Sequence, residues 1–103
     1  MPDLQPAPDR GVYAISVAAE MVGTGIQNLR AYERRGLVEP ARTEGGTRRY
    51  SEEDVERLVR IRELLDAGLN LAGIDKVLEL EAEVARLRAQ DDGATTRSRP
   101  PRP

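Results

Sequence analysis

The chain has 103 residues, 39% of them hydrophobic and 33% charged, with three tyrosines but no phenylalanine or tryptophan. That length allows one compact domain plus tails, and an aliphatic core favours a small helical domain that completes its burial with a partner chain. The absence of cysteine and histidine excludes disulfides, thiol or imidazole catalysis and the usual ligands for zinc or copper. We therefore expect no cofactor, metal site or catalytic site. Because no apolar run approaches the ~20 residues of a membrane span, and no signal peptide opens the chain, we expect a cytoplasmic protein without a membrane partner.

The net charge of −2 is unevenly distributed along the chain. Residues 24–50 carry six arginines against three glutamates, whereas residues 51–92 carry six basic and twelve acidic residues. The tail after residue 92 has three arginines and no acid. A basic segment beside an acidic one is compatible with DNA binding, because binding depends on the face presented and not on the total charge.

The first third of the chain predicts a helix-turn-helix. Residues 1–11 contain three prolines and are expected to be disordered, and residues 12–15 are expected to form a short strand. Ser16 is predicted to cap a short helix ending at Gly23, with core positions at Val17, Ala18, Met21 and Val22. The capping-box pattern from Thr24 to Gln27 starts a second helix, which Gly36 ends after Arg35. Two short helices joined in this way form a helix-turn-helix.

A β-hairpin is predicted between the second and third helices. The Gly45-Gly46 pair fits a tight turn that needs positive φ, between residues 37–43 and 47–50. Ser51 then caps a third helix with acids in its first turn, and Gly68 stops it. Its core positions are Val55, Leu58, Ile61, Leu64 and Leu65.

The last predicted helix is capped by Asn70 and runs to Gln90. Val77, Leu80, Val84 and Leu87 recur at spacings of 3, 4 and 3, as in a coiled-coil seam, and predict a homodimer. A single amphipathic helix packed on its own domain has a similar pattern. The tail at 91–103 is compositionally a disordered basic segment.

Residues 15–77 resemble the N-terminal domain of the MerR family of bacterial transcription regulators, most closely its heat-shock-repressor branch. The resemblance lies in Leu29-Arg30-Ala31-Tyr32-Glu33-Arg34-Arg35-Gly36-Leu37, in Pro40-Ala41-Arg42 and in Gly45-Gly46-Thr47-Arg48-Arg49-Tyr50-Ser51. The branch is indicated by residues 13–20 and by residues 68–74 with residues 78–81.

This resemblance implies a mainly α fold, a winged helix-turn-helix with a β-hairpin wing and a C-terminal dimerisation helix. It places the DNA-binding domain at 12–76 and the coiled-coil helix at 77–90. The implied function is a dimeric regulator bound to a pseudo-palindromic promoter site in double-stranded DNA, a repressor of stress or chaperone genes. A chaperone co-repressor or RNA polymerase is implied as a further partner.

The candidate DNA-binding residues lie on the second helix and on the wing. Early residues of a recognition helix meet base edges, where Gln and Asn pair with adenine and Arg pairs with guanine or a phosphate. Tyrosine hydroxyls and wing arginines donate to phosphates, and two arginines adjacent on a strand point to opposite faces, so that one of them contacts DNA. The candidates are Gln27, Asn28, Arg30, Tyr32, Arg48, Arg49 and Tyr50. Each tyrosine has an alternative role as a core residue, and Gln27 has an alternative role in the capping box.

Two other functions compete with this interpretation. A protein-interaction adaptor for a chaperone or sigma factor would use the acidic last helix, but it would not need an arginine-rich wing. An enzyme is disfavoured, because the sequence holds no nucleophile–base constellation and no phosphate-binding glycine loop. A phage-type excisionase shares the winged motif, but the longer third and fourth helices favour a promoter regulator.

Overall fold

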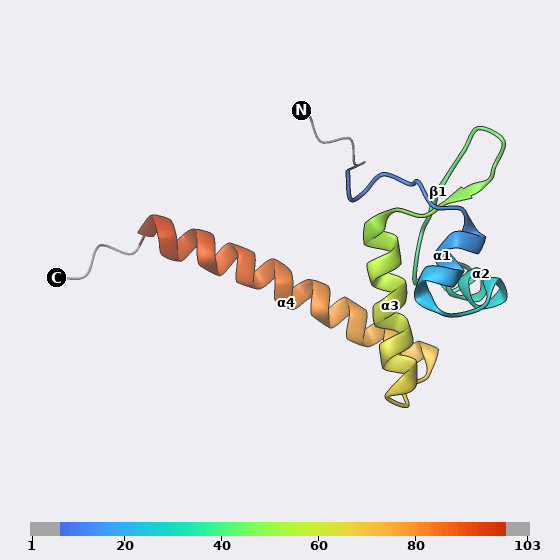
Figure 1. Ribbon diagram of the computed structural model, residues 1–103. Coiled ribbons are helices and arrows are strands. Elements are labelled where there is room, and N and C mark those ends of the chain that lie inside the picture. The colour runs from blue at the N-terminus through green and yellow to red at the C-terminus, as the bar shows by residue number, and fades with distance from the viewer. Residues whose placement is uncertain (1–6, 99–103) are drawn as a thin grey trace. The chain divides into compact units, whose positions relative to one another are not determined.

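The computed structural model describes residues 7–98, with side chains as far as Asp91. Four helices and one antiparallel hairpin follow one another along the chain (Figure 1) as α1 Ile15–Val22, α2 Ile26–Arg34, β1 Ala41–Arg42, β2 Arg48–Arg49, α3 Glu52–Asp66 and α4 Leu71–Ser98. The predicted class, a mainly helical winged helix-turn-helix, is confirmed. Within the part of the chain that the structure describes, no helix is long and apolar enough to cross a membrane.

The chain divides into two units, Met1–Gly68 and Leu69–Pro103. The predicted boundary at residues 76/77 is therefore too late. The unit boundary falls at the turn between α3 and α4, where Gly68 has a φ of 98° and interrupts the helical path. The first unit contains the helix-turn-helix, the hairpin and α3, and the second contains α4.

The core of the first unit forms around α1, which contacts both α2 and α3. Its buried apolar side chains come from all three helices and from the loop after α2, namely Ala18, Ala19, Val22, Leu29, Leu37, Val38, Leu58, Ile61 and Leu64. The core positions predicted at Val17 and Met21 are wrong, since these side chains are 46% and 50% exposed. The N-cap is Ala14 and not Ser16, and the helix turns Ala18, Ala19 and Val22 inward.

The wing is a hairpin that projects beyond α1 and α2 in Figure 1. Ala41 pairs with Arg49, and Arg42 pairs with Arg48. Residues 43–47 form the loop, closed by hydrogen bonds from Gly46 N to Thr43 O (2.9 Å) and from Thr43 N to Thr47 O (2.8 Å). The predicted positive φ occurs at Gly46 (87°) and not at Gly45, because the loop is longer than a two-residue turn.

The segment before α1 lies against the second wing strand. The predicted strand at 12–15 is reduced to one bridge, between Tyr13 and Tyr50, since α1 already begins at Ile15. Gly11 packs so closely that a Cβ added there would lie 2.6 Å from the carbonyl oxygen of Arg49. Farther back, Pro8 O accepts from Glu53 N at 3.0 Å. The predicted disorder is therefore wrong for residues 7–11, while residues 1–6 lie outside the described part.

The predicted caps of α3 and α4 are confirmed. Ser51 Oγ accepts from Asp54 N and Asp54 Oδ2 accepts from Ser51 N, both at 2.9 Å, so that the two residues form a capping box. Asn70 Oδ1 accepts from Gly73 N at 2.8 Å. Helix α4 continues past its predicted end at Gln90 to Ser98, because the first helix-breaking proline after Gln90 is Pro100. The tail arginines lie outside the described side chains.

Candidate nucleic-acid interface

Helix α2 exposes the side chains at its beginning. Gln27, Asn28 and Arg30 are all exposed, whereas Leu29, between them, is fully buried and anchors the helix to the core. An open recess of about 380 Å³ is lined by Gly25, Ile26, Gln27 and Asn28. Two amide side chains and a guanidinium therefore lie beside an accessible hollow, which is the donor and acceptor set that reads base edges.

The predicted capping box at the start of α2 is wrong. The N-cap is Gly25, and no side chain caps the helix. Thr24 lies one residue too early to cap the helix, and its Oγ1 accepts instead from Asn28 Nδ2 at 2.8 Å. Gln27 is therefore not engaged in a cap, and one amide proton of Asn28 is directed toward Thr24 and away from any base.

Tyr32 is a core tyrosine with a hydrogen-bonded hydroxyl. Its side chain is 5% exposed, and the hydroxyl is hydrogen-bonded with Thr24. Burial raises the pKa of Tyr32, and the bond with Thr24 opposes that rise. Thr24 thus joins Asn28 and Tyr32 along one face of α2, and the structural role weighed for Tyr32 is the one that its burial favours.

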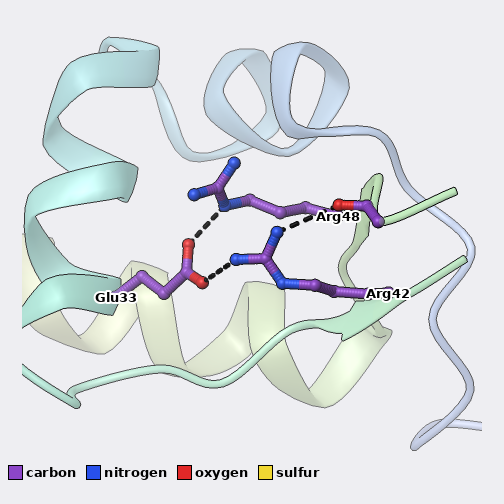
Figure 2. A network of polar contacts seen from close by, with 4 residues as sticks. Glu33, Arg42 and Arg48 are labelled. Atoms are coloured by element: carbon purple, nitrogen blue, oxygen red, sulfur yellow. Dashed lines mark hydrogen bonds and ion pairs between the residues drawn. The ribbon is translucent and has the colours of Figure 1, made fainter.

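A cluster of one acid and two arginines links α2 to the wing (Figure 2). Glu33 reaches between the two strands: its Oε2 accepts from Arg42 Nη2 at 2.6 Å, and its Oε1 accepts from Arg48 Nε. Arg42 also donates through Nη1 to Gly46 O at 3.0 Å, which ties the same guanidinium to the wing loop. We call Glu33, Arg42 and Arg48 the wing cluster.

The wing cluster is charged in the folded protein. Burial raises the pKa of Glu33, but the hydrogen bonds and charges of Arg48 and Arg42 outweigh it, so that the pKa lies below its ordinary value. The hydrogen bond to Glu33 raises the pKa of Arg48. Glu33 is therefore ionised, and it accepts hydrogen bonds from both cations throughout the neutral pH range.

The remaining wing candidates differ in exposure. Arg49 is half-buried, and its Nη1 donates to Arg48 O at 3.2 Å. Tyr50 is fully buried, and its hydroxyl has no hydrogen-bond partner among the described residues. Burial, followed by the nearby charge of Glu33, raises the pKa of Tyr50. In this conformation Tyr50 is a core residue, and its hydroxyl does not reach a surface at which a phosphate could lie.

Sequence reasoning missed the roles of Glu33 and Arg42. One signal for them was present: the hairpin register places Arg42 directly opposite Arg48. Two like charges that face each other across a strand pair repel, so an anion has to lie between them. Identifying Glu33 as that anion needs the tertiary fold, because it lies on α2, fifteen residues before Arg48. Arg34 and Arg35, exposed at the end of α2, are further basic groups on the same helix.

Comparison with known proteins establishes what this arrangement belongs to. Residues 13–81 match the MerR HTH family of regulatory proteins, which covers α1 to α3, the wing and the first part of α4. The chain belongs to the MerR family. It is therefore related to transcription regulators, and its family is not one of enzymes.

Related MerR proteins include one from Streptomyces coelicolor whose name, HspR, describes it as a heat shock protein. It is 48% identical over 99 residues, covering 88% of this chain and 66% of the relative. The regulator GlnR of Bacillus anthracis is 35% identical over 82 residues, covering 77% of this chain and 64% of the relative. The chain thus spans just under two thirds of the length of these two relatives.

A solved MerR structure shows the same fold on its target. HiNmlR, described as a MerR family regulator lacking the sensor domain and bound to promoter DNA, superposes with a TM-score of 0.62 at 26% identity, covering 82% of this chain and 70% of that one. The lead(II) complex of PbrR691 from Ralstonia metallidurans CH34 superposes with a TM-score of 0.63 at 27% identity, covering 82% and 79% of the two chains. The MerR fold of this chain is therefore one that is known to bind promoter DNA.

Proposed function

We propose that this MerR protein is a sequence-specific, dimeric repressor of stress or chaperone genes, bound as a homodimer to a pseudo-palindromic promoter site. The observation that carries the proposal is the exposed first turn of α2, with Gln27, Asn28 and Arg30 directed to solvent beside a basic wing. The 48% identity to HspR supports the assignment to stress genes. A chaperone co-repressor or RNA polymerase is the further protein partner that we propose.

The two parts of the interface have separate roles in this proposal. Gln27, Asn28 and Arg30 contact base edges and supply specificity, because each good bidentate contact discriminates against a wrong base by ~1–3 kcal/mol. Arg48 and Arg49 contact phosphates, which position the protein and supply affinity. The buried Tyr32 and Tyr50 hold the helix and the wing in place, and their direct phosphate contacts are withdrawn from the proposal.

The proposed dimer forms through one face of α4. Leu80, Val84 and Leu87 are 63%, 44% and 49% exposed, and Val77 lies in line with them. An apolar groove of about 400 Å³ runs along this face, and it is bordered by Glu81 and Arg88. Ile74 and Leu78, on another face of the helix, are already buried. A second copy of α4 fits the groove, since it presents the same apolar row and charges of both signs at its rim.

The proposed DNA contacts are tested with two arginine variants on one helix. Wild-type protein first selects duplexes from a random-sequence pool, and titrations then compare the best duplex with a scrambled one at several salt concentrations. Arg30→Ala should reduce the affinity ratio of the two duplexes by about 5- to 150-fold, the equivalent of one base contact. Arg34→Ala, the matched loss of charge one turn later, should weaken both complexes alike and leave the ratio intact.

Two results would contradict the proposal. An unchanged affinity ratio in Arg30→Ala removes this residue from base readout. Failure of the wild type to enrich any duplex, together with binding of a chaperone or sigma factor, would favour the adaptor function. The assignment to stress genes is tested separately, by whether deletion of the gene raises expression from chaperone promoters in unstressed cells.

A further inference from the structure

Glu33 is an acidic residue in the middle of the proposed DNA-binding surface. It lies on α2, one turn after Arg30, and its partners are the two wing arginines. Phosphates repel a carboxylate, so that simple electrostatics predicts tighter DNA binding when the charge of Glu33 is removed. The geometry of the wing cluster predicts the opposite.

The first reason is the cross-strand pair of like charges. Arg42 and Arg48 face each other in the register of the hairpin, and without an anion their repulsion would drive the strands apart. The Glu33 side chain is 19% exposed, against 44% for Arg42 and 27% for Arg48, so the ion pairs are partly shielded from water. A network of three charges in such a site is stronger than an isolated surface pair.

The second reason is how Arg48 uses its donors. Only Nε donates to Glu33, and no other hydrogen bond of this guanidinium is made among the described residues. Its two Nη groups, which form the outer edge of the fork, are therefore available for a phosphate. The carboxylate and a phosphate can occupy two different edges of one guanidinium at the same time, and the first then orients the second.

We propose that Glu33 is a positioning residue for DNA binding, whose carboxylate fixes the wing against α2 and orients the outer edge of Arg48 toward the DNA backbone. Glu33 itself contacts no DNA. Arg42 completes the link, because its second hydrogen bond reaches Gly46 O in the wing loop. The inference rests on the proposed DNA-binding function, but the order of the wing can be measured without DNA.

The test compares two glutamate-to-glutamine variants on a mixed-sequence duplex. Glu33→Gln and Glu44→Gln each remove one negative charge from the wing region, but Glu44 is exposed in the wing loop and makes no ion pair with the described residues. Loss of one phosphate contact lowers the salt slope by about 0.9, which at about 0.1 M salt is a five- to tenfold loss of affinity. We expect this loss in Glu33→Gln, and unchanged or tighter binding in Glu44→Gln.

A thermodynamic cycle tests whether Glu33 acts through Arg48. Arg48→Met should show the same loss of salt slope as Glu33→Gln, and adding Glu33→Gln to Arg48→Met should change affinity by less than about twofold. Independent, additive losses would overturn the proposal, as would tighter binding of Glu33→Gln. Circular dichroism verifies that each variant is folded.

Hydrogen exchange on the free protein tests the link without DNA. The wing amides of Thr43 and Gly46 should exchange about tenfold faster in Glu33→Gln than in the wild type or in Glu44→Gln. Equal wing protection in all three proteins would overturn the positioning role, whatever the DNA result. If no variant, and not even the wild type, binds the duplex, the proposed function fails, while the exchange rates alone decide the role of Glu33 in holding the wing.

Discussion

Replacing Tyr50 by phenylalanine should stabilise the protein. The Tyr50 side chain is fully buried, and its hydroxyl has no partner among the described residues. Burying an unpaired polar group costs ~1–3 kcal/mol, whereas the void left by one oxygen atom costs a few tenths of that, at ~0.3 kcal/mol. We therefore expect a gain of about 1 kcal/mol in the free energy of unfolding, and a rise of roughly 4–8 °C in Tm for a domain of this size.

Tyr32→Phe is the matched control for this prediction. Tyr32 is also buried, but its hydroxyl is hydrogen-bonded with Thr24, so the same substitution should cost about 1 kcal/mol. Urea unfolding followed by circular dichroism, at equal protein concentrations, measures both values. A destabilised Tyr50→Phe, or a loss of about one in its salt slope on DNA, would show that the Tyr50 hydroxyl has a partner and that the reasoning from burial is wrong.

Three further predictions concern the dimer, the wing and the pH range. Leu80→Asp combined with Val84→Asp should give monomers in sedimentation that keep the circular dichroism of the first unit, because both side chains are more than 40% exposed on the proposed seam; a double variant that stays dimeric would locate the interface elsewhere. Gly11→Ala should destabilise the protein by about 1–3 kcal/mol in urea unfolding, since its Cβ would lie 2.6 Å from Arg49 O; an unchanged midpoint would contradict the close packing. The stability difference between wild type and Glu33→Gln should be constant from about pH 8 to pH 5 and vanish as the pH falls through the lowered pKa of Glu33, because a carboxylate with a lowered folded pKa stabilises only while it is ionised. A transition near neutral pH would contradict this, because the chain has no histidine.

Local signals predicted the ends of the elements well where one residue type dominates the choice. Ser51 and Asn70 cap their helices as expected, because each side chain reaches backbone N–H groups within the next turn. Gly36 ends α2 with a φ of 77°, a conformation that other residues rarely adopt. These outcomes depend on neighbours in sequence, and a sequence alone is sufficient to predict them.

The wrong predictions have a common physical cause. Thr24 fits a capping box by its spacing, but its hydroxyl has a competing partner in Asn28. Val17 and Met21 fit an apolar helix face, but the helix starts one residue before Ser16 and buries two alanines instead. The wing cluster joins residues 33, 42 and 48, and only the tertiary packing of α2 on the hairpin brings them together. Each outcome was decided by a contact that spacing does not encode.

The central claim is that the start of α2 lies on base edges, and tethered DNA cleavage measures this directly. Because the chain has no cysteine, Gln27→Cys gives one attachment point for an iron chelate that cuts nearby DNA, and Glu44→Cys gives a second one on the wing. On a duplex selected by the wild type, the Gln27 label should cut inside both half-sites, and the Glu44 label should cut only at flanking positions. Cleavage from the Gln27 label that is absent or spread evenly along the duplex, while the footprint stays intact, would contradict the placement of α2 at the bases.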